Sequence, residues 1–412
     1  MSQQTVAIIG YGSAGVNCAI ALRNAGFEGK IIAFSRGGDI PYSPILTSYY
    51  AAGAKTFDEC HPWTAEELAS LNVEVKQNCP VEGIDLEAHL VRTAQGDFSY
   101  DKCLISTGSD PALVGFPKVE GYSPITLRSM EDAQRLKDVV DNPDCTRMLV
   151  SGASMVALKT LEACLAGGMQ VTLVGMNPHI LDFNALPEAA SRFEEGLRNM
   201  GVTLKLGTTM SEVKLLESEI PGVPRLEVSF ANGDVDVFNE ISVSHGMRSN
   251  IAFIPEGALE GFRSLTVDPF MRTSNPDVYA AGDVAANVEL ISGQNRVVGI
   301  WKNAVLQGAC AGTVMAAELA GREVPQSAAL QGSISTNTIN VGDLLFISAG
   351  TIEVGEGRHV ELRDTEDMLV VYVWEGSRLV GFNVVCENPE FHSVAYDTGA
   401  MLTLRIEKAC RA

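Results

Sequence analysis

The sequence predicts an α/β protein that contains two βαβ units. The first indication is residues 6–9, a run of buried-strand residues that leads into G-x-G-x-x-G and then into a helical pattern closed by Gly26. The second is residues 148–151, another apolar strand followed by a glycine turn and a helical pattern. The third is the length of 412 residues, because a single core stops growing at roughly 250 to 300 residues. Two or three domains are therefore expected.

Composition and charge exclude several classes of function. The formal net charge of −21 argues against a nucleic acid or an anionic membrane as partner, because both require clustered lysine and arginine. No apolar run approaches the roughly 18 residues that span a bilayer, and the N-terminus has no basic region of a signal peptide, so a cytoplasmic protein is expected. The nine cysteines are scattered without metal-like spacing, so no metal site is expected.

The first glycine turn has the residue pattern of a dinucleotide site. Gly10 permits the tight turn, Gly12 lets the backbone approach a pyrophosphate, and Gly15 lets the helix pack closely on the strand. Ser13 and Ala14 begin the helix, whose N-terminus offers N–H groups and a partial positive charge. The five residues are candidate cofactor-binding residues, and a purely structural strand-to-helix turn is the alternative.

The second strand of this unit, residues 30–34, ends without the usual acid. A dinucleotide site places an acidic residue there to bind the ribose hydroxyls, but this sequence has Ser35 and Arg36. Arg36 cannot accept a hydrogen bond from a ribose, although its guanidinium plane can lie on an adenine ring or meet a phosphate. Both residues are kept as cofactor candidates.

Three further segments carry a family resemblance. Residues 100–111 contain ISTGSDP, residues 271–285 read MRTSNPDVYAAGDVA, and residues 296–308 read RVVGIWKNAVLQG. With the first turn, they resemble the FAD-dependent pyridine nucleotide-disulfide oxidoreductase superfamily, in the branch of ferredoxin and rubredoxin reductases, NADH oxidases, coenzyme A disulfide reductases and the nitrite reductase flavoprotein. The resemblance implies FAD as cofactor and adds these candidates for binding it: Pro44, Thr107, Gly108, Gly282, Asp283, Trp301, Asn303 and Ala304.

The same resemblance implies a division into domains. Residues 1–112 and 246–324 are expected to form a Rossmann-like FAD-binding domain, residues 113–245 an NAD(P)-type Rossmann-like domain, and residues 325–412 a small C-terminal α/β domain. In relatives the C-terminal domain supports dimers, so a homodimer or a subunit of a complex is expected.

The second glycine turn departs from the pattern for NADH or NADPH. Gly152 is retained, but Ser154 replaces the second glycine, Lys159 replaces a usual glutamate, and Gly175 replaces the acid after the next strand. The nicotinamide candidates are Gly152, Ser154, Met155, Val156, Lys159 and Gly175. Two interpretations remain open: an atypical nicotinamide site, or a domain retained as a scaffold.

The residues that could carry chemistry are few. The segment PYSPILTSYY aligns with the motif of the single-cysteine branch, and Ile45 stands at the cysteine position, which excludes a thiol relay there. Tyr42 and Tyr49 are expected to line or adjoin the flavin. Only His245 and Lys302 could move protons or stabilise charge near the flavin; a core histidine and a solvated lysine are the alternatives.

The sequence thus predicts an FAD-dependent oxidoreductase in which NADH or NADPH reduces the flavin and a small molecule or an electron-acceptor protein takes the electrons. Two alternatives stay open. One is a flavin dehydrogenase or oxidase that is independent of nicotinamide and acts on an organic substrate, alone or within a complex. The other is a non-catalytic protein that FAD stabilises for interaction with partners.

Overall fold

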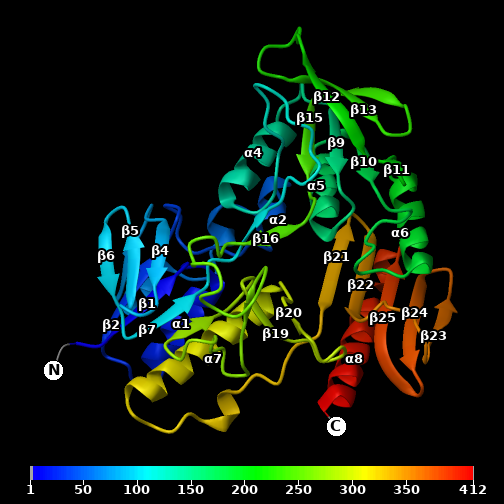
Figure 1. The fold of residues 1–412 in the computed structure, drawn as a ribbon. Coiled ribbons are helices and arrows are strands. Elements are labelled where there is room, and N and C mark those ends of the chain that lie inside the picture. Colours follow the sequence, from blue (N-terminus) through cyan, green and yellow to red (C-terminus); the bar gives the residue numbers. More distant parts are fainter. Residues whose placement is uncertain (1–2, 412) are drawn as a thin grey trace. The chain divides into compact units, whose positions relative to one another are not determined.

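The computed structural model describes residues 3–411, and the chain forms two compact units (Figure 1). Unit 1 consists of Met1–Pro44, Phe57–Asp110 and Met247–Ser333, and unit 2 of Ile45–Thr56, Pro111–Gly246 and Ile334–Ala412. The chain therefore leaves and re-enters unit 1 twice. The finer division into three domains, with the boundaries given above, stays a prediction.

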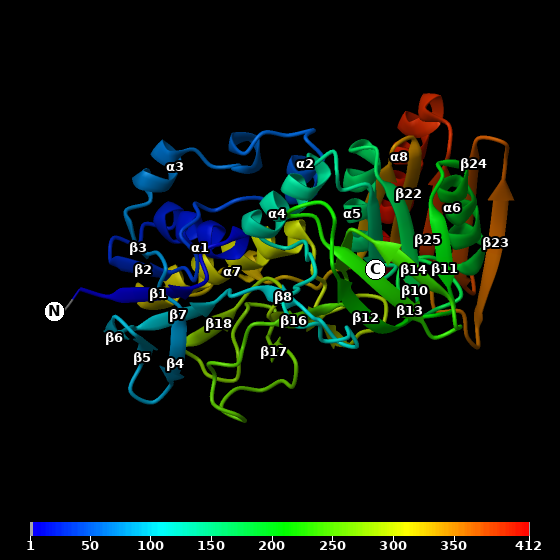
Figure 2. The same cartoon turned by 90° about the horizontal axis from the view of Figure 1, so that it is seen from above.

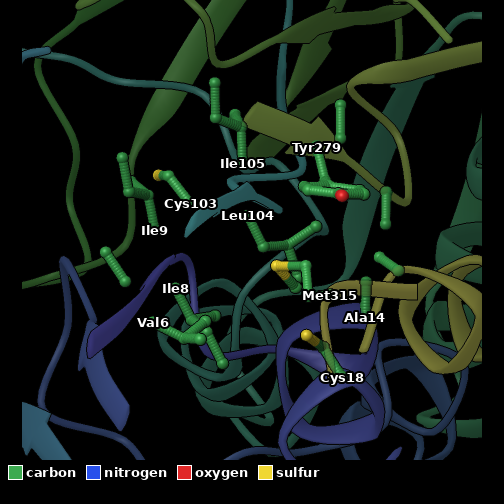
Figure 3. Close-up of a cluster of buried hydrophobic side chains, with 14 of the residues drawn as sticks. Val6, Ile8, Ile9, Ala14, Cys18, Cys103, Leu104, Ile105, Tyr279 and Met315 are labelled. Carbon is green, nitrogen blue, oxygen red and sulfur yellow. The ribbon is translucent and has the colours of Figure 1, made fainter. Parts of the chain in front are cut away.

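A five-stranded parallel sheet is the centre of unit 1. Its strand order is β18-β7-β1-β2-β3, and every pair in it is parallel. The strands are β1 (Thr5–Ile9), β2 (Lys30–Phe34), β3 (Val73–Lys76), β7 (Lys102–Ile105) and β18 (Val278–Ala280). The three central strands are almost wholly buried, which explains their continuous apolar sequence. Figure 3 shows the side chains of β1 and β7 in this core with Cys18 and Met315.

Helices α1 (Ser13–Asn24) and α7 (Trp301–Leu319) pack directly against each other, as Figure 2 also shows. Two glycines of α7 permit this approach. A Cβ atom on Gly308 would lie 2.1 Å from the carbonyl oxygen of Ala14, and one on Gly312 would lie 2.4 Å from that of Cys18. The two helices that begin at the predicted cofactor turns are thus held as one rigid pair.

The remaining elements of unit 1 are short. Helix α3 (Ala65–Ser70) begins with a capping box formed by Thr64 and Glu67. Three small sheets complete the unit: β4 (Val81–Asp85), β5 (Leu90–Thr93) and β6 (Gly96–Ser99); β8 (Ser109–Pro111) with β16 (Met247–Ser249); and β17 (Leu265–Thr266), β19 (Ala285–Val288) and β20 (Asn295–Arg296).

Unit 2 contains a second parallel sheet, with strand order β11-β10-β9-β15. Its strands are β9 (Arg147–Ser151), β10 (Gln170–Gly175), β11 (Thr203–Leu206) and β15 (Glu240–Val243). The helices are α2 (Thr47–Ala51), α4 (Met130–Val140), α5 (Met155–Ala166) and α6 (Pro187–Asn199), and an antiparallel sheet comprises β12 (Met210–Leu216), β13 (Arg225–Phe230) and β14 (Val235–Phe238). The predicted second βαβ unit is present as β9-α5-β10.

The C-terminal part of unit 2 is an antiparallel sheet covered by one helix. The sheet order is β21-β22-β25-β24-β23, formed by β21 (Thr336–Val341), β22 (Leu344–Gly350), β23 (Arg358–Asp364), β24 (Met368–Glu375) and β25 (Arg378–Cys386). Helix α8 (His392–Arg411) packs on β22 and β25. It approaches closely at Gly399, where a Cβ atom would lie 3.0 Å from Ile347. The predicted small α/β domain therefore has the expected mixed composition.

Candidate cofactor sites

The turn between β1 and α1 is shaped by its glycines in two different ways. Gly10 has φ +98°, and a Cβ atom there would lie 2.3 Å from the carbonyl oxygen of Ser106, while a Cβ on Gly15 would lie 2.3 Å from the oxygen of Gly10. Packing of the chain itself thus requires these two glycines. A Cβ on Gly12 would meet no heavy atom within 4 Å. Gly12 therefore faces open space, as a backbone that receives a pyrophosphate must.

The N-termini of α1 and α7 in unit 1 suit anionic groups. The N-cap of α1 is Gly12 and that of α7 is Ile300; neither helix has a side-chain cap or an acidic residue in its first turn. Partial positive charge at such an end favours a pyrophosphate or a negatively charged flavin ring. At α7, the buried Asn303 fixes the entering chain by donating to the carbonyl oxygen of Val298 at 3.0 Å.

The candidates after β7 and β18 lie at the same edge of the sheet, because both strands run parallel to β1. Thr107 donates through its hydroxyl to the carbonyl oxygen of Asn250 at 2.6 Å. Asp283 accepts from the Ser109 hydroxyl at 2.8 Å, and the N–H of Gly282 donates to the Gln307 side chain at 2.8 Å. The Ser109 hydroxyl thus helps to hold the Asp283 carboxylate in place, and its role as an acceptor for sugar hydroxyls stays a prediction. The open turn, the two uncapped helices and this acceptor together fit FAD.

Arg36 is engaged within unit 1. Its guanidinium donates to both carboxylate oxygens of Asp110, at 2.6 and 2.8 Å. Hydrogen bonding to Asp110 raises the pKa of Arg36 further above its usual range, so the charge is permanent but matched. Because Asp110 already neutralises the charge of Arg36, binding a phosphate there would gain little. The planar face of the guanidinium can still stack on an adenine.

Two aromatic residues that the sequence did not indicate join the predicted Tyr42 and Trp301. The ring of His61 lies 6.5 Å from that of Tyr42, and the ring of Trp63 lies 5.8 Å from that of Trp301, tilted by 33°. Trp63 is about 240 residues from Trp301 in the sequence, so only the fold brings the two together. Lys302 is exposed in the first turn of α7.

The second glycine turn keeps the shape of the first but not its open helix end. Gly152 has φ +112°, and a Cβ atom there would lie 2.4 Å from the carbonyl oxygen of Ser244, so Gly152 corresponds in role to Gly10. Ser154, however, is the N-cap of α5, and its hydroxyl accepts from the N–H of Ala157 at 3.4 Å. A side chain therefore occupies the helix end that is open at Gly12 in α1.

Gly175, the last residue of β10, has restricted space. A Cβ atom there would lie 3.2 Å from both the Ala153 Cβ and the Leu206 Cδ2. An acidic side chain at this position would require its neighbours to shift by a few tenths of an ångström. Of the remaining candidates, Met155 is partly buried and Val156 exposed in the first turn of α5. The turn fits a dinucleotide in backbone shape and differs in the side chains around it.

Lys159 supports the packing of α5. Its ammonium forms an ion pair with Glu162, lies 4.1 Å from the ring centroid of Tyr49 and 3.4 Å from the carbonyl oxygen of Asn340. These contacts connect α5 to α2 and β21. Both Lys159 and Tyr49 are thus in structural contacts within unit 2, and a role toward a cofactor remains a prediction for each.

His245 has a protein partner at each ring nitrogen. Nε2 lies 2.8 Å from the Ser151 hydroxyl and Nδ1 lies 2.7 Å from the carbonyl oxygen of Val114. A neutral ring with its proton on Nδ1 satisfies both, donating to the carbonyl and accepting from the serine. This is the geometry of a structural histidine, and a catalytic role for His245 or Lys302 stays a prediction.

No thiol is available at the position of the family's redox cysteine. Ile45 is there, with 53 % of its surface exposed. None of the nine cysteines, all of which lie within residues 3–411, is in a disulfide bond, and every one except Cys410 is buried. Burial raises the pKa of Cys310 to about 12 and moves those of Cys18, Cys103 and Cys164 even higher, so these thiols are poor nucleophiles.

Residues 3–411 contain neither a metal-binding cluster of side chains nor a membrane-spanning helix. Within this range no group of three or more histidine, cysteine, aspartate or glutamate side chains is arranged to hold a metal ion. Across the same residues no helix has both the length and the apolar character needed to cross a bilayer.

Comparison with known proteins gives the family. A profile described as pyridine nucleotide-disulphide oxidoreductase matches residues 4–308. An NADH oxidase of Methanocaldococcus jannaschii is 25% identical over 348 residues, 82% of this chain and 74% of the relative. A rubredoxin-NAD(+) reductase of Pseudomonas putida is 26% identical over 322 residues, 78% of this chain and 81% of the relative.

Among solved structures, an NAD-dependent persulfide reductase from A. fulgidus superimposes with a TM-score of 0.86 at 21% identity, covering 98% of this chain and 77% of the other. This likeness supports the fold. The family profile covers about three quarters of the sequence, including both glycine turns and the segment that contains Asp283. The chain belongs to the pyridine nucleotide-disulphide oxidoreductase family and is an FAD-dependent oxidoreductase.

Proposed function

We propose that this protein transfers electrons from NADH or NADPH through FAD to a small acceptor or an electron-carrier protein, without a thiol relay. The observation that carries the proposal is Ile45 at the family's cysteine position, together with the burial of eight of the nine cysteines. An alkyl side chain has no redox chemistry, and a buried thiol of raised pKa is inert. Electrons therefore leave the cofactor directly.

When bound, FAD supplies the hydride-accepting and electron-donating chemistry. The residues of unit 1 bind and orient it. The N-termini of α1 and α7 stabilise negative charge on the pyrophosphate and the ring, and Asp283 accepts from sugar hydroxyls. Lys302 lies in the first turn of α7, where a cation is unfavourable unless an anionic group lies near it. We assign to it charge stabilisation at the ring.

The proposed acceptor is an electron-carrier protein. The Pseudomonas putida relative is named for its action on rubredoxin, and a similar carrier fits a reductase that has no relay of its own. The net charge of −21 favours a carrier whose docking face is basic, because complementary potentials accelerate the encounter. Such a face is the property by which to select candidate carriers.

The number of electrons that the protein accepts tests this proposal. A reductase with a redox-active thiol pair takes up roughly twice the electrons of a bare flavin, whereas FAD alone takes up about two. We expect an anaerobic dithionite titration of the FAD-loaded protein to end at about two electrons per flavin. An endpoint near four electrons would show a second redox centre and would contradict the proposal.

One observation favours a second candidate function. Ser154 caps α5, whereas the corresponding Gly12 leaves α1 open. A site closed to nicotinamide would leave a flavin dehydrogenase or oxidase that takes electrons from an organic donor. Screening organic donors for anaerobic reduction of the flavin tests it: reduction by such a donor, with NADH and NADPH both inactive, would establish this function in place of the first.

A further inference from the structure

We propose that Asp182 replaces the carboxylate missing from the end of β10 and makes the nicotinamide site of unit 2 selective for NADH over NADPH. The inference rests on the proposed function, in which unit 2 binds a nicotinamide dinucleotide. Asp182 is not at the position where the family pattern places its acid, since it follows Gly175 by seven residues. The loop between Gly175 and Asp182 places the Asp182 carboxylate near the end of β10.

The loop after β10 returns to the glycine turn. The N–H of Leu181 donates to the carbonyl oxygen of Ala153 at 2.8 Å, directly between Gly152 and Ser154. Leu181 is 1% exposed and has φ +55°, a left-handed conformation that is strained for a branched side chain. Buried packing and the bond to Ala153 hold this strain, and the next residue is Asp182. The loop is thus fixed against the place where a pyrophosphate would lie.

A hydrogen bond places the carboxylate beside the strand end. The side-chain amide of Asn177 donates to Oδ2 of Asp182. Asn177 is the second residue after β10, and its carbonyl oxygen accepts from the N–H of Gly207 at 2.9 Å, immediately after β11. The Asp182 carboxylate, which is partly exposed, therefore lies in contact with Asn177, two residues after Gly175, where the family pattern has its acid.

The packing at Gly175 explains why the acid comes from the loop. A side chain there would press against Ala153 and Leu206 at 3.2 Å. Ala153 is also the residue that anchors Leu181, so a larger group at 175 would disturb the anchor of the loop. The strand end can hold a glycine and a returning carboxylate, but not an aspartate of its own without movement.

The charges around Asp182 favour a ribose over a phosphorylated ribose. The sequence has no lysine or arginine between Lys159 and Arg192, and Arg192 pairs with Asp364 and Glu387. On the neighbouring strand Lys205 pairs with Asp234. Ribose hydroxyls can donate to Asp182, whereas a 2′-phosphate would meet a carboxylate with no unmatched cation among these residues.

His179 is the other titratable group of the loop. Its Nδ1 lies 3.1 Å from the buried Glu194, which also accepts from the N–H of Ile180 at 3.1 Å. Glu194 additionally pairs with Arg198 at 3.4 Å. The Nδ1 side of the imidazole is therefore engaged with the carboxylate of α6.

Equilibrium binding of NADH and of NADPH to the oxidised, FAD-loaded protein, measured by calorimetry with acceptor and oxygen absent, tests the inference. Because both ligands can reduce the flavin, their oxidised forms NAD⁺ and NADP⁺ are titrated in parallel. The variants are Asp182→Asn, Asp182→Glu and the control Asp138→Asn. Asp138 accepts from the Gln134 amide on the exposed face of α4, which matches the amide–carboxylate pair at Asp182.

We expect the wild type to bind the non-phosphorylated nucleotide at least about tenfold more tightly, since like charge disfavours the phosphate. Asp182→Asn should bring the ratio close to one, while Asp182→Glu and Asp138→Asn keep the preference. Equal affinities in the wild type, or an unchanged ratio in Asp182→Asn, would overturn the inference. Failure of the wild type to bind either nucleotide would instead overturn the proposed function, on which the inference depends.

Discussion

Gly10 and Gly12 are two residues apart in one turn, but their replacement should affect different properties. Replacing Gly10 should mainly lower stability, and replacing Gly12 should mainly weaken FAD binding. Gly10 has φ +98° and no space for a side chain, whereas Gly12 has φ −90° and nothing within 4 Å of a Cβ position. Gly10→Ala should therefore lower the free energy of unfolding by more than about 2 kcal/mol. Gly12→Val should lower it by only about 1 kcal/mol, because valine is a poorer N-cap than glycine, and should weaken FAD binding at least about tenfold.

Urea unfolding of the apoprotein and FAD titration of each variant would measure these two effects. Gly26→Ala is the matched control for the backbone, since Gly26 also has positive φ but faces open space away from the turn. Equal loss of stability in the Gly10 and Gly12 variants, with FAD affinity retained, would show that the turn is structural and receives no pyrophosphate.

Glu318 forms the centre of a charged network at the end of the unit 1 sheet opposite the glycine turn. It accepts from Lys102 at 2.6 Å, from Tyr279 at 2.6 Å and from Arg272 at 2.7 Å, and Lys102 is 9% exposed. Burial by itself raises the pKa of Glu318, but these hydrogen bonds outweigh it and hold the pKa below the usual 4.5 of a glutamate. Removing this acceptor leaves Lys102 with Asp277 as its remaining ion-pair partner.

A pH-dependent loss of stability follows. Because the folded-state pKa of Glu318 is lowered, its stabilisation is present above pH 4.5 and is lost as the pH falls through the lower, folded-state value. Glu318→Gln should cost at least about 2 kcal/mol at pH 7, and the difference from the wild type should shrink below pH 4.5. Urea unfolding followed by the fluorescence of Trp63 and Trp301 in a Trp374→Phe background would report it; a difference that is constant with pH would contradict this.

At the scale of elements, α1 and α5 are the same motif with different N-caps. Ser154→Gly would remove the hydroxyl from the end of α5, at a cost to the helix of only a few tenths of a kcal/mol because glycine is itself an acceptable N-cap. We expect it to tighten NADH binding several-fold by opening the helix end to a pyrophosphate. Ser154→Ala, which retains a side chain, is the control, and an equal response of both variants would count against the comparison with α1.

The helices and strands that carry the motifs could be predicted from local sequence. The strands at 6–9 and 148–151 and the helices that follow them are present, because apolar runs that break into glycine turns leave few alternatives. The assignment of residues 45–56 to unit 2 could not be predicted from local sequence, because it depends on long-range packing.

The candidate sites were predictable to different degrees. The FAD candidates of unit 1 come from segments whose spacing is fixed by parallel strands, so their meeting at one sheet edge could be foreseen. Trp63, the contact of Lys159 with Tyr49 and the return of Asp182 could not. These three features depend on contacts between distant segments or on the strained backbone of Leu181. Such contacts and such strain leave no pattern in the sequence.

In the whole molecule, reduction of FAD by a nicotinamide nucleotide requires both βαβ motifs, the one in unit 1 and the one in unit 2. Unit 1 has the open turn and two uncapped helix ends that suit FAD, and unit 2 has the second turn, narrowed by Ser154. The single claim that joins them is that a nicotinamide nucleotide reduces the FAD of this chain.

Anaerobic stopped-flow mixing of the FAD-loaded protein with NADH, and separately with NADPH, tests that claim most directly. We expect the visible absorbance of the flavin to be lost within seconds with NADH, and more slowly or only at higher concentration with NADPH. A bound flavin that neither nucleotide reduces at millimolar concentration would overturn the nicotinamide-dependent function and leave the organic-donor function in its place.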